Sequence, residues 1–120
     1  MTSDAPRTQG PDPDGPPTEV LLRPERSRYE ILVGGRLAGI AAFTEIDGVT
    51  VFTHTVVQDE FEGQGYASAM VDGAIADVVA RGGRFAAICP YVRHWLTKFH
   101  QHDAALAPLP TAVAGGRLLD

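Results

Sequence analysis

The amino-acid sequence predicts an α+β domain in which a mainly antiparallel sheet is extended by one parallel β-α-β unit. Two observations support this prediction. Three short β-branched segments are separated by Gly34-Gly35 and Asp47-Gly48, dipeptides that are typical of tight hairpin turns. A segment with helical periodicity, residues 66–81, then lies between two segments with the composition of strands. That order predicts a right-handed parallel crossover.

The two ends of the chain differ in composition from its middle. Residues 1–18 contain five of the nine prolines and no Val, Ile, Leu or Phe. Such a segment cannot bury enough apolar surface to offset the entropy lost on ordering, so we expect a disordered tail. After Asp103 the sequence loses periodicity, and we expect residues 106–120 to form a frayed tail. The folded domain is therefore predicted to span residues 19–105.

The first half of this domain predicts a meander of strands. Residues 19–26 are transitional and can start a strand before Pro24. Residues 28–33 alternate between apolar and polar side chains, which is the period of a half-buried strand. Residues 37–43 form the return strand, and residues 49–57 form a third antiparallel strand. The apolar face of residues 28–33 consists of Tyr29, Ile31 and Val33.

The second half predicts helix, strand and helix. In residues 66–81 apolar side chains recur every four positions in two neighbouring stripes, which indicates a helix with a wide apolar face. The stripes are Met70, Ala74 and Val78, and Val71, Ile75 and Val79. Gly82-Gly83 ends this helix, and residues 84–89 predict a short buried strand. Pro90 suits the first turn of a second helix, from Tyr91 to about His100.

Composition and charge exclude several classes of protein. The net charge of −5 is opposite to that of a nucleic-acid-binding surface, so we expect no nucleic-acid partner. The single cysteine excludes an internal disulfide framework and suits a reducing compartment. No apolar run approaches the roughly 18 residues of a membrane span, and the polar N-terminus has no signal-peptide core. We therefore expect a cytoplasmic protein without membrane contact.

Gly63 and Gly65 stand where a predicted strand gives way to a helix. The first amides of a helix have no intrahelical acceptor, and the helix dipole favours negative charge there. This arrangement indicates a site for a phosphate-bearing ligand. No Gly-Lys-Ser/Thr follows, so it is not a Walker loop, and Ser68 replaces the third glycine of the dinucleotide fingerprint. On spacing alone, a tight strand-helix turn that binds nothing is an equally good interpretation.

The segment around these glycines resembles the acetyl-CoA loop of the GCN5-related N-acetyltransferases. The resemblance lies in a strand that ends in Thr55-Val56-Val57 and is followed by Glu62-Gly63-Gln64-Gly65-Tyr66-Ala67. Residues 51–70, together with Cys89-Pro90-Tyr91-Val92, are similar to a branch of very short single-domain members. That branch carries a Cys-(Pro/Ser)-(Tyr/Phe)-Val segment after its last core strand. The resemblance covers residues 28–102 and implies the fold of that family.

The resemblance also implies acetyl-CoA as co-substrate. Its pyrophosphate would rest on the backbone amides of the glycine turn and of the helix that the turn opens. Its pantetheine arm would run beside the strand that ends at Val57, and the acyl group would enter between the strands ending at Val57 and Cys89. The implied coenzyme A-binding residues are Val56, Val57, Glu62, Gly63, Gln64, Gly65, Tyr66, Ala67 and Ser68.

Two side chains are candidates for catalysis. Cys89, at the predicted mouth of the acyl site, is a candidate acyl-accepting nucleophile or proton donor to the coenzyme A thiolate. The alternative is a small buried apolar residue, as free cysteines often are. His54 is a candidate general base for the incoming amine, and the alternative is an ordinary half-buried strand residue. Tyr91 can pack on Pro90 or bind ligand. The remaining histidines form no credible ligand set with Cys89, so we expect no metal.

These observations predict an N-acetyltransferase that moves an acetyl group from acetyl-CoA to a primary amine, on a small molecule or on a protein lysine. Direct transfer is the first mechanism, and a relay through Cys89 is the second. A non-catalytic module that binds acyl-CoA or a protein partner through the same cleft is the alternative from another class. A different nucleotide or phosphate ligand on the glycine turn is a third.

Overall fold

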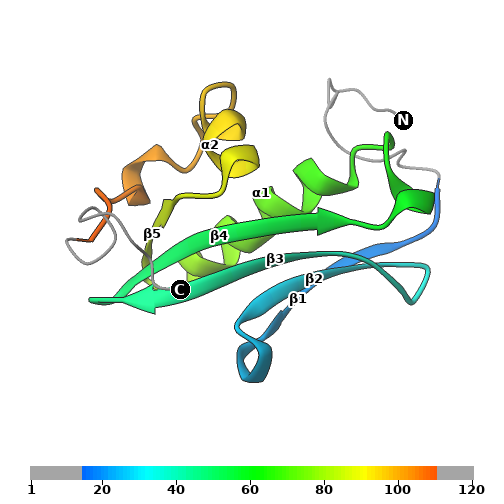
Figure 1. Ribbon diagram of the computed structural model, residues 1–120, viewed down its shortest axis with the longest axis horizontal. Helices are drawn as coiled ribbons and strands as arrows, with labels where there is room; N and C mark the ends of the chain where they lie inside the picture. The colour runs from blue at the N-terminus through cyan, green and yellow to red at the C-terminus, as the bar shows by residue number, and fades with distance from the viewer. Residues whose placement is uncertain (1–14, 111–120) are drawn as a thin grey trace.

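A computed structural model describes residues 15–110 as one five-stranded sheet with a long helix across one face (Figure 1). The strands lie side by side in chain order, β1-β2-β3-β4-β5. They are β1 (Thr18–Arg23), β2 (Arg28–Val33), β3 (Arg36–Ile46), β4 (Val49–Val57) and β5 (Arg84–Ala87). The helices are α1 (Tyr66–Ala80) and α2 (Pro90–Leu96), and short 3-10 turns cover Pro24–Arg26, Asp59–Phe61 and Asp103–Ala105.

The strand pairing confirms the predicted α+β class. β1 to β4 are antiparallel neighbours, and β5 pairs with β4 in parallel after the α1 crossover. Both predicted hairpin turns have the backbone that a type I′ turn needs, with φ of 56° and 82° at Gly34 and Gly35. In the second turn φ is 52° at Asp47 and 78° at Gly48.

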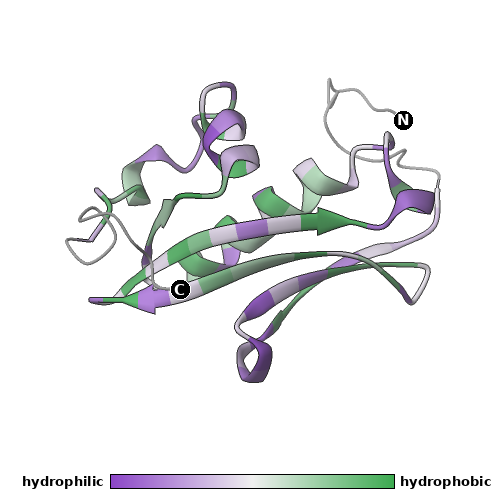
Figure 2. Ribbon diagram, in the orientation of Figure 1, coloured by the Kyte–Doolittle hydropathy of each residue, from purple (hydrophilic) through white to green (hydrophobic). Residues whose placement is uncertain are grey.

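The hydrophobic core lies between α1 and the sheet. Figure 2 shows apolar residues along the strands and α1, whereas the turn between β1 and β2 is hydrophilic. Both predicted stripes of α1 are buried except Val79, which is 39% exposed. The expectation for Val79 was wrong because each step of four residues turns the stripe by about 40° around the helix. The last member of the second stripe has therefore rotated to the rim of the interface.

The C-terminal end of α1 is tied to the sheet by a polar contact. The Tyr29 hydroxyl on β2 donates a hydrogen bond of 2.7 Å to the Asp77 carboxylate. Arg81 Nε donates to the same carboxylate oxygen at 2.7 Å, which is the i,i+4 pair expected on a helix surface. These bonds fix the far end of α1, so its N-terminal end is held at a defined place beside β4.

The side chains of β4 divide between the two faces of the sheet. On the α1 side, Phe52 pairs with Phe43 and Thr55 pairs with Ala41. On the opposite side, which we call the outer face, His54 pairs with Ala42 and Val56 pairs with Ile40. A β-bulge between the Phe52–Phe43 pair and the His54–Ala42 pair accommodates the extra residue Thr53.

One prediction for the C-terminal part was wrong. The second helix ends at Leu96 and not near His100, because the Thr97 hydroxyl and amide both donate to the His94 carbonyl and close the last turn. Residues 106 and 107, which fall in the segment predicted to fray, contact β5. Leu106 forms a parallel bridge with Phe85, and the Ala107 amide donates to the Phe85 carbonyl at 2.7 Å.

The pairing with Leu106 covers part of the edge of β5 that does not contact β4. The periodicity of the sequence does not indicate this contact. Residues 111–120 of the predicted C-terminal tail and residues 1–14 of the predicted N-terminal tail lie outside the described residues. The last residue of the predicted N-terminal tail, Thr18, begins β1. Within residues 15–110 no helix is both long enough and apolar enough to cross a membrane.

Candidate functional site

The site is built where β5 leaves β4. The parallel pairing runs from Val49 opposite Arg84 to Phe52 opposite Ala87 and ends there. The Phe52 carbonyl then accepts two hydrogen bonds, from the amides of Ile88 at 2.9 Å and Cys89 at 3.1 Å. After this shared acceptor β4 continues to Val57, while Pro90 starts α2. Residues 53–57 therefore have β3 on one side and no β5 partner on the other.

A cleft of about 640 Å³ lies on the α1 side of this divergence. Its walls come from the end of β4, the turn after β4, the first turn of α1 and the first turn of α2. The lining residues are Thr55, Val57, Phe61, Glu62, Gly63, Gly65, Tyr66, Ala67, Ser68 and Tyr91.

The start of α1 presents unpaired amides to the cleft. Gly63 and Gly65 have φ of 78° and 88°, a conformation that L-residues rarely adopt. Gly65 is the N-cap of α1, and no side chain caps the helix. Within residues 15–110 no group accepts a hydrogen bond from the amides of residues 63–68. These donors and the positive end of the helix dipole make the turn suitable for an anion.

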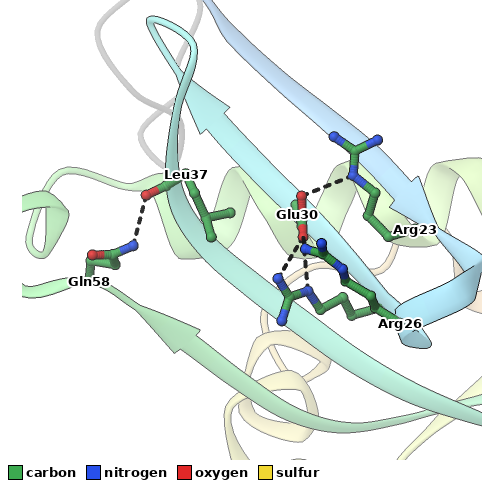
Figure 3. Close-up of polar contacts among 6 residues, drawn as sticks. Arg23, Arg26, Glu30, Leu37 and Gln58 are labelled. Atoms are coloured by element: carbon green, nitrogen blue, oxygen red, sulfur yellow. Dashed lines mark hydrogen bonds and ion pairs between the residues drawn. The ribbon is translucent and has the colours of Figure 1, made fainter.

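The turn itself is held against β3. The Gln58 amide donates to the Ala38 carbonyl at 2.8 Å, and the Gln58 side chain donates to the Leu37 carbonyl at 2.9 Å (Figure 3). Arg36 forms an ion pair with Glu60, and its guanidinium lies 5.4 Å from the centre of the Phe61 ring. The Glu60 charge beside the cleft is thus matched by an arginine.

Ser68 connects the two helices. Its hydroxyl accepts a hydrogen bond of 2.8 Å from the indole nitrogen of Trp95, and both residues are buried. The Ser68 side chain therefore fixes α2 against α1. Ser68 also belongs to the lining of the cleft.

Three polar side chains meet where the cleft reaches α2. The Cys89 sulfur is 3.7 Å from the Thr55 hydroxyl, and Cys89 is only 3% exposed. Thr55 and Tyr91 line the cleft. Burial raises the pKa of the Tyr91 phenol, and the neighbouring Cys89 adds to that rise. Tyr91 therefore keeps its proton at neutral pH and is available as a hydrogen-bond donor.

A sequence model of the family described as GCN5-related N-acetyl-transferase matches residues 28–106. The chain belongs to the GCN5-related N-acetyltransferase family. The matched segment begins with β2 and ends at Leu106, so it contains the whole cleft and the bridge from Leu106 to Phe85. No curated protein sequence matches the chain.

One solved structure has a similar fold. The NMR solution structure of a GCN5-like protein from Staphylococcus aureus, described as a candidate N-acetyltransferase, superposes with a TM-score of 0.58. The two sequences are 18% identical, and the match covers 78% of this chain and 91% of the other. At this identity the likeness establishes the fold.

Most of the coenzyme A residues predicted from the family resemblance lie together at the cleft. Val57, Glu62, Gly63, Gly65, Tyr66, Ala67 and Ser68 line it. Val56 and Gln64 do not belong to its lining. Val56 faces the outer side of the sheet and is 44% exposed, and the Gln64 side chain donates to the Glu60 carbonyl.

Sequence reasoning missed some cleft residues. Thr55 shares a strand face with Val57, so the period of two could have identified it. Phe61 stands between acidic residues in a turn and packs edge-on against Tyr66, with ring centres 5.9 Å apart. Its burial had no signal in the sequence. The sequence left Tyr91 as either a packing or a ligand residue, and the structure puts it in the cleft wall.

The two candidate catalytic residues of this family member are not together. Cys89 lies on the α1 side behind the cleft wall, whereas His54 is exposed on the outer face. They flank β4 from opposite sides and form no Cys-His pair. In the described part of the chain, no three His, Cys, Asp or Glu side chains lie close enough to hold a metal ion.

Proposed function

We propose that this protein transfers the acetyl group of acetyl-CoA to a primary amine. The observation that supports this function most is the continuity of the cleft. One hollow connects the unpaired amides at the start of α1 with the stretch of β4 that β5 has left. A ligand with an anionic end and a long arm that carries an acyl group matches this shape.

The pyrophosphate of acetyl-CoA would accept hydrogen bonds from the amides of residues 63–68. Glycine at positions 63 and 65 places no side chain over the turn at those two positions. The pantetheine arm would lie along Thr55 and Val57, toward Tyr91 and the end of β5. The cleft volume of about 640 Å³ falls within the usual range for ligand sites.

The chemistry then needs few protein groups. The amine nitrogen attacks the thioester carbonyl carbon, and the carbonyl electron pair moves to oxygen. Collapse of this tetrahedral intermediate breaks the carbon-sulfur bond, and coenzyme A leaves as a thiolate. A β4 amide beyond Phe52, where no β5 strand competes for it, would donate to the oxyanion.

Two side chains would act on the charges that develop during the transfer, one at the departing sulfur and one at the attacking amine. The Tyr91 hydroxyl would donate a hydrogen bond to the departing sulfur, since its raised pKa keeps it protonated. His54 would accept the proton that the amine loses, from the outer face of β4. The burial of Cys89 favours direct transfer over an acyl-cysteine relay, because the sulfur lies outside the cleft lining.

A second candidate is a non-catalytic module that binds acyl-CoA through the same cleft. The separation of His54 and Cys89 to opposite sides of β4 favours it, because no ready nucleophile and base stand together in the cleft.

Steady-state assays separate the two candidates. The protein is mixed with acetyl-CoA and a panel of primary amines, and free coenzyme A thiol and acetylated amine are measured together. Equal amounts of both products, dependent on enzyme and amine, support the transferase. Binding of acetyl-CoA without either product supports the binding module. Absence of binding contradicts both.

A further inference from the structure

The outer face of the sheet offers a second approach to the reactive part of β4. The cleft for acetyl-CoA occupies the α1 side, so an acceptor must reach β4 from elsewhere. Beyond Phe52 no β5 strand covers the edge of β4. On the outer face of this stretch, His54 is exposed and Val56 is 44% exposed.

An arginine cluster lies on the same face. Arg23, Arg26 and Arg28 surround the Glu30 carboxylate, whose side chain is 5% exposed (Figure 3). The contacts are 3.0 Å from Arg23, 3.4 Å from Arg26, and 2.9 and 2.7 Å from the two nitrogens of Arg28. Three guanidinium groups face one carboxylate, so positive charge remains in excess. Glu25 in the same turn offsets one charge at most.

The excess positive charge of the arginine cluster faces solvent. The side chains of Arg26 and Arg23 are 58% and 38% exposed, and Arg23 uses only its Nε toward Glu30. The protein as a whole carries a net charge of −5, whereas the three arginines around Glu30 keep a local excess of positive charge. Such a patch attracts carboxylates and repels cations over about one Debye length, roughly 8 Å at physiological salt.

The cluster and His54 are connected by a straight row across the sheet. Arg28 pairs with Ala42, and Ala42 pairs with His54, so the row crosses two strand intervals, about 10 Å. Because Ala42 carries only a methyl group, no large side chain stands between Arg28 and His54 in this row. A parallel row runs from Glu30 through Ile40 to Val56, which adds apolar surface. Exposed apolar side chains bordered by arginines are typical of protein-binding surfaces.

We propose that the acetyl acceptor is a lysine in a polypeptide segment whose neighbouring side chains are carboxylates. The lysine amine lies at His54 and Val56, and the flanking carboxylates lie on Arg26 and Arg23. The span of about two strand intervals suits a lysine with its neighbours along a chain. This inference rests on the proposed acetyl transfer and names its substrate class.

The test compares three peptides of equal length with one central lysine, flanked by aspartate and glutamate, by glutamine, or by arginine. We expect KM to be lowest for the acidic peptide and highest for the arginine peptide, with roughly a tenfold range. Arg26→Gln should raise KM for the acidic peptide roughly threefold and leave kcat unchanged. Lys98→Gln, an equal loss of charge at an exposed position after α2, should change neither constant.

A binding measurement separates this proposal from the transfer reaction. Fluorescence anisotropy with the labelled acidic peptide needs no acetyl-CoA. Binding that Arg26→Gln and Arg23→Gln each weaken supports the docking surface even where no acetyl is transferred. Transfer with equal KM for the three peptides, preference for the arginine peptide, or acceptance of small amines alone overturns the docking proposal and leaves the transferase intact.

Discussion

His54 and Thr55 are consecutive residues of β4, and their side chains lie on opposite faces of the sheet. Thr55 pairs with Ala41 on the α1 side and touches the Cys89 sulfur at 3.7 Å, whereas His54 pairs with Ala42 on the outer face. The backbone between them is the stretch that β5 leaves uncovered. In the proposed reaction, acetyl-CoA would contact this stretch from the α1 side and the amine would contact it from the outer face. His54, which accepts the amine proton, and Tyr91, which donates a hydrogen bond to the departing thiolate, therefore need not be neighbours.

Replacement of Cys89 by alanine tests the relay. Because the sulfur is buried and lies outside the cleft lining, we expect Cys89→Ala to keep turnover within roughly twofold of the wild type. Coenzyme A release under steady state measures this, and mass spectrometry of the acid-quenched protein should show no acyl adduct on the wild type. Normal acetyl-CoA binding with lost turnover would instead establish Cys89 as the relay.

Replacement of Tyr91 by phenylalanine tests the proton donor. We expect Tyr91→Phe to lower kcat roughly tenfold and leave acetyl-CoA affinity nearly unchanged, because the hydroxyl acts on the charge that develops in the transition state. The matched control is Tyr29→Phe, which removes a hydroxyl bonded to Asp77 at the far end of α1. This control should lose stability and keep kcat. Equal loss of kcat in both variants would assign the effect to the fold.

The Ser68 and Trp95 contact should be structural. Ser68→Ala leaves the buried indole nitrogen of Trp95 without its acceptor, which should cost about 2 kcal/mol of unfolding free energy. The double variant with Trp95→Phe should be less destabilised than the sum of the two single variants, as urea unfolding of the full cycle will show. Additive losses would mean that the hydrogen bond contributes nothing.

Glu30 should make stability depend on pH. Burial raises the pKa of its carboxyl, but hydrogen bonds and charges from Arg28 and Arg23 outweigh burial and lower the pKa below its ordinary value of 4.5. The associated stability is therefore present above pH 4.5 and lost as pH falls through the lowered pKa. Glu30→Gln should cost roughly 2 kcal/mol at pH 7, since three arginines lose their carboxylate.

Urea unfolding from pH 7 downward should show a shallower acid loss in the Glu30→Gln variant than in the wild type. Part of the loss will remain in both proteins, because Asp77 also has a lowered pKa. There too, burial raises the pKa, and the hydrogen bonds from Arg81 and Tyr29 outweigh it. Parallel pH curves for the two proteins would contradict the role given to Glu30.

Local chemistry made much of the fold predictable. The hairpin dipeptides and the glycine turn require positive φ, which is a property of single residues, and the structure has it at Gly34, Gly48 and Gly63. The β-branched run of residues 49–57 became β4 with the same bounds. The glycine turn was recognisable for the same reason, since it combines a strand end, flexible residues and a helix start.

Features that depend on tertiary contact were not predictable. Regular alternation would place His54 and Phe52 on one face, but the bulge at Thr53 moves His54 to the outer face while Phe52 stays in the core. The pairing of Leu106 with Phe85 depends on the free edge of β5, which only the assembled sheet defines. The burial of Phe61 likewise results from Arg36 and Tyr66 packing on its ring.

Calorimetric titration measures directly whether the glycine turn at the start of α1 holds acetyl-CoA. Gly63 and Gly48 both have φ of 78° and open space at the Cβ position, so alanine strains the backbone equally at each. Only Gly63 lines the cleft. We predict micromolar binding to the wild type and to Gly48→Ala, and roughly tenfold weaker binding to Gly63→Ala. No binding to the wild type at millimolar acetyl-CoA, or equal affinity in the two variants, would show that the turn does not hold acetyl-CoA.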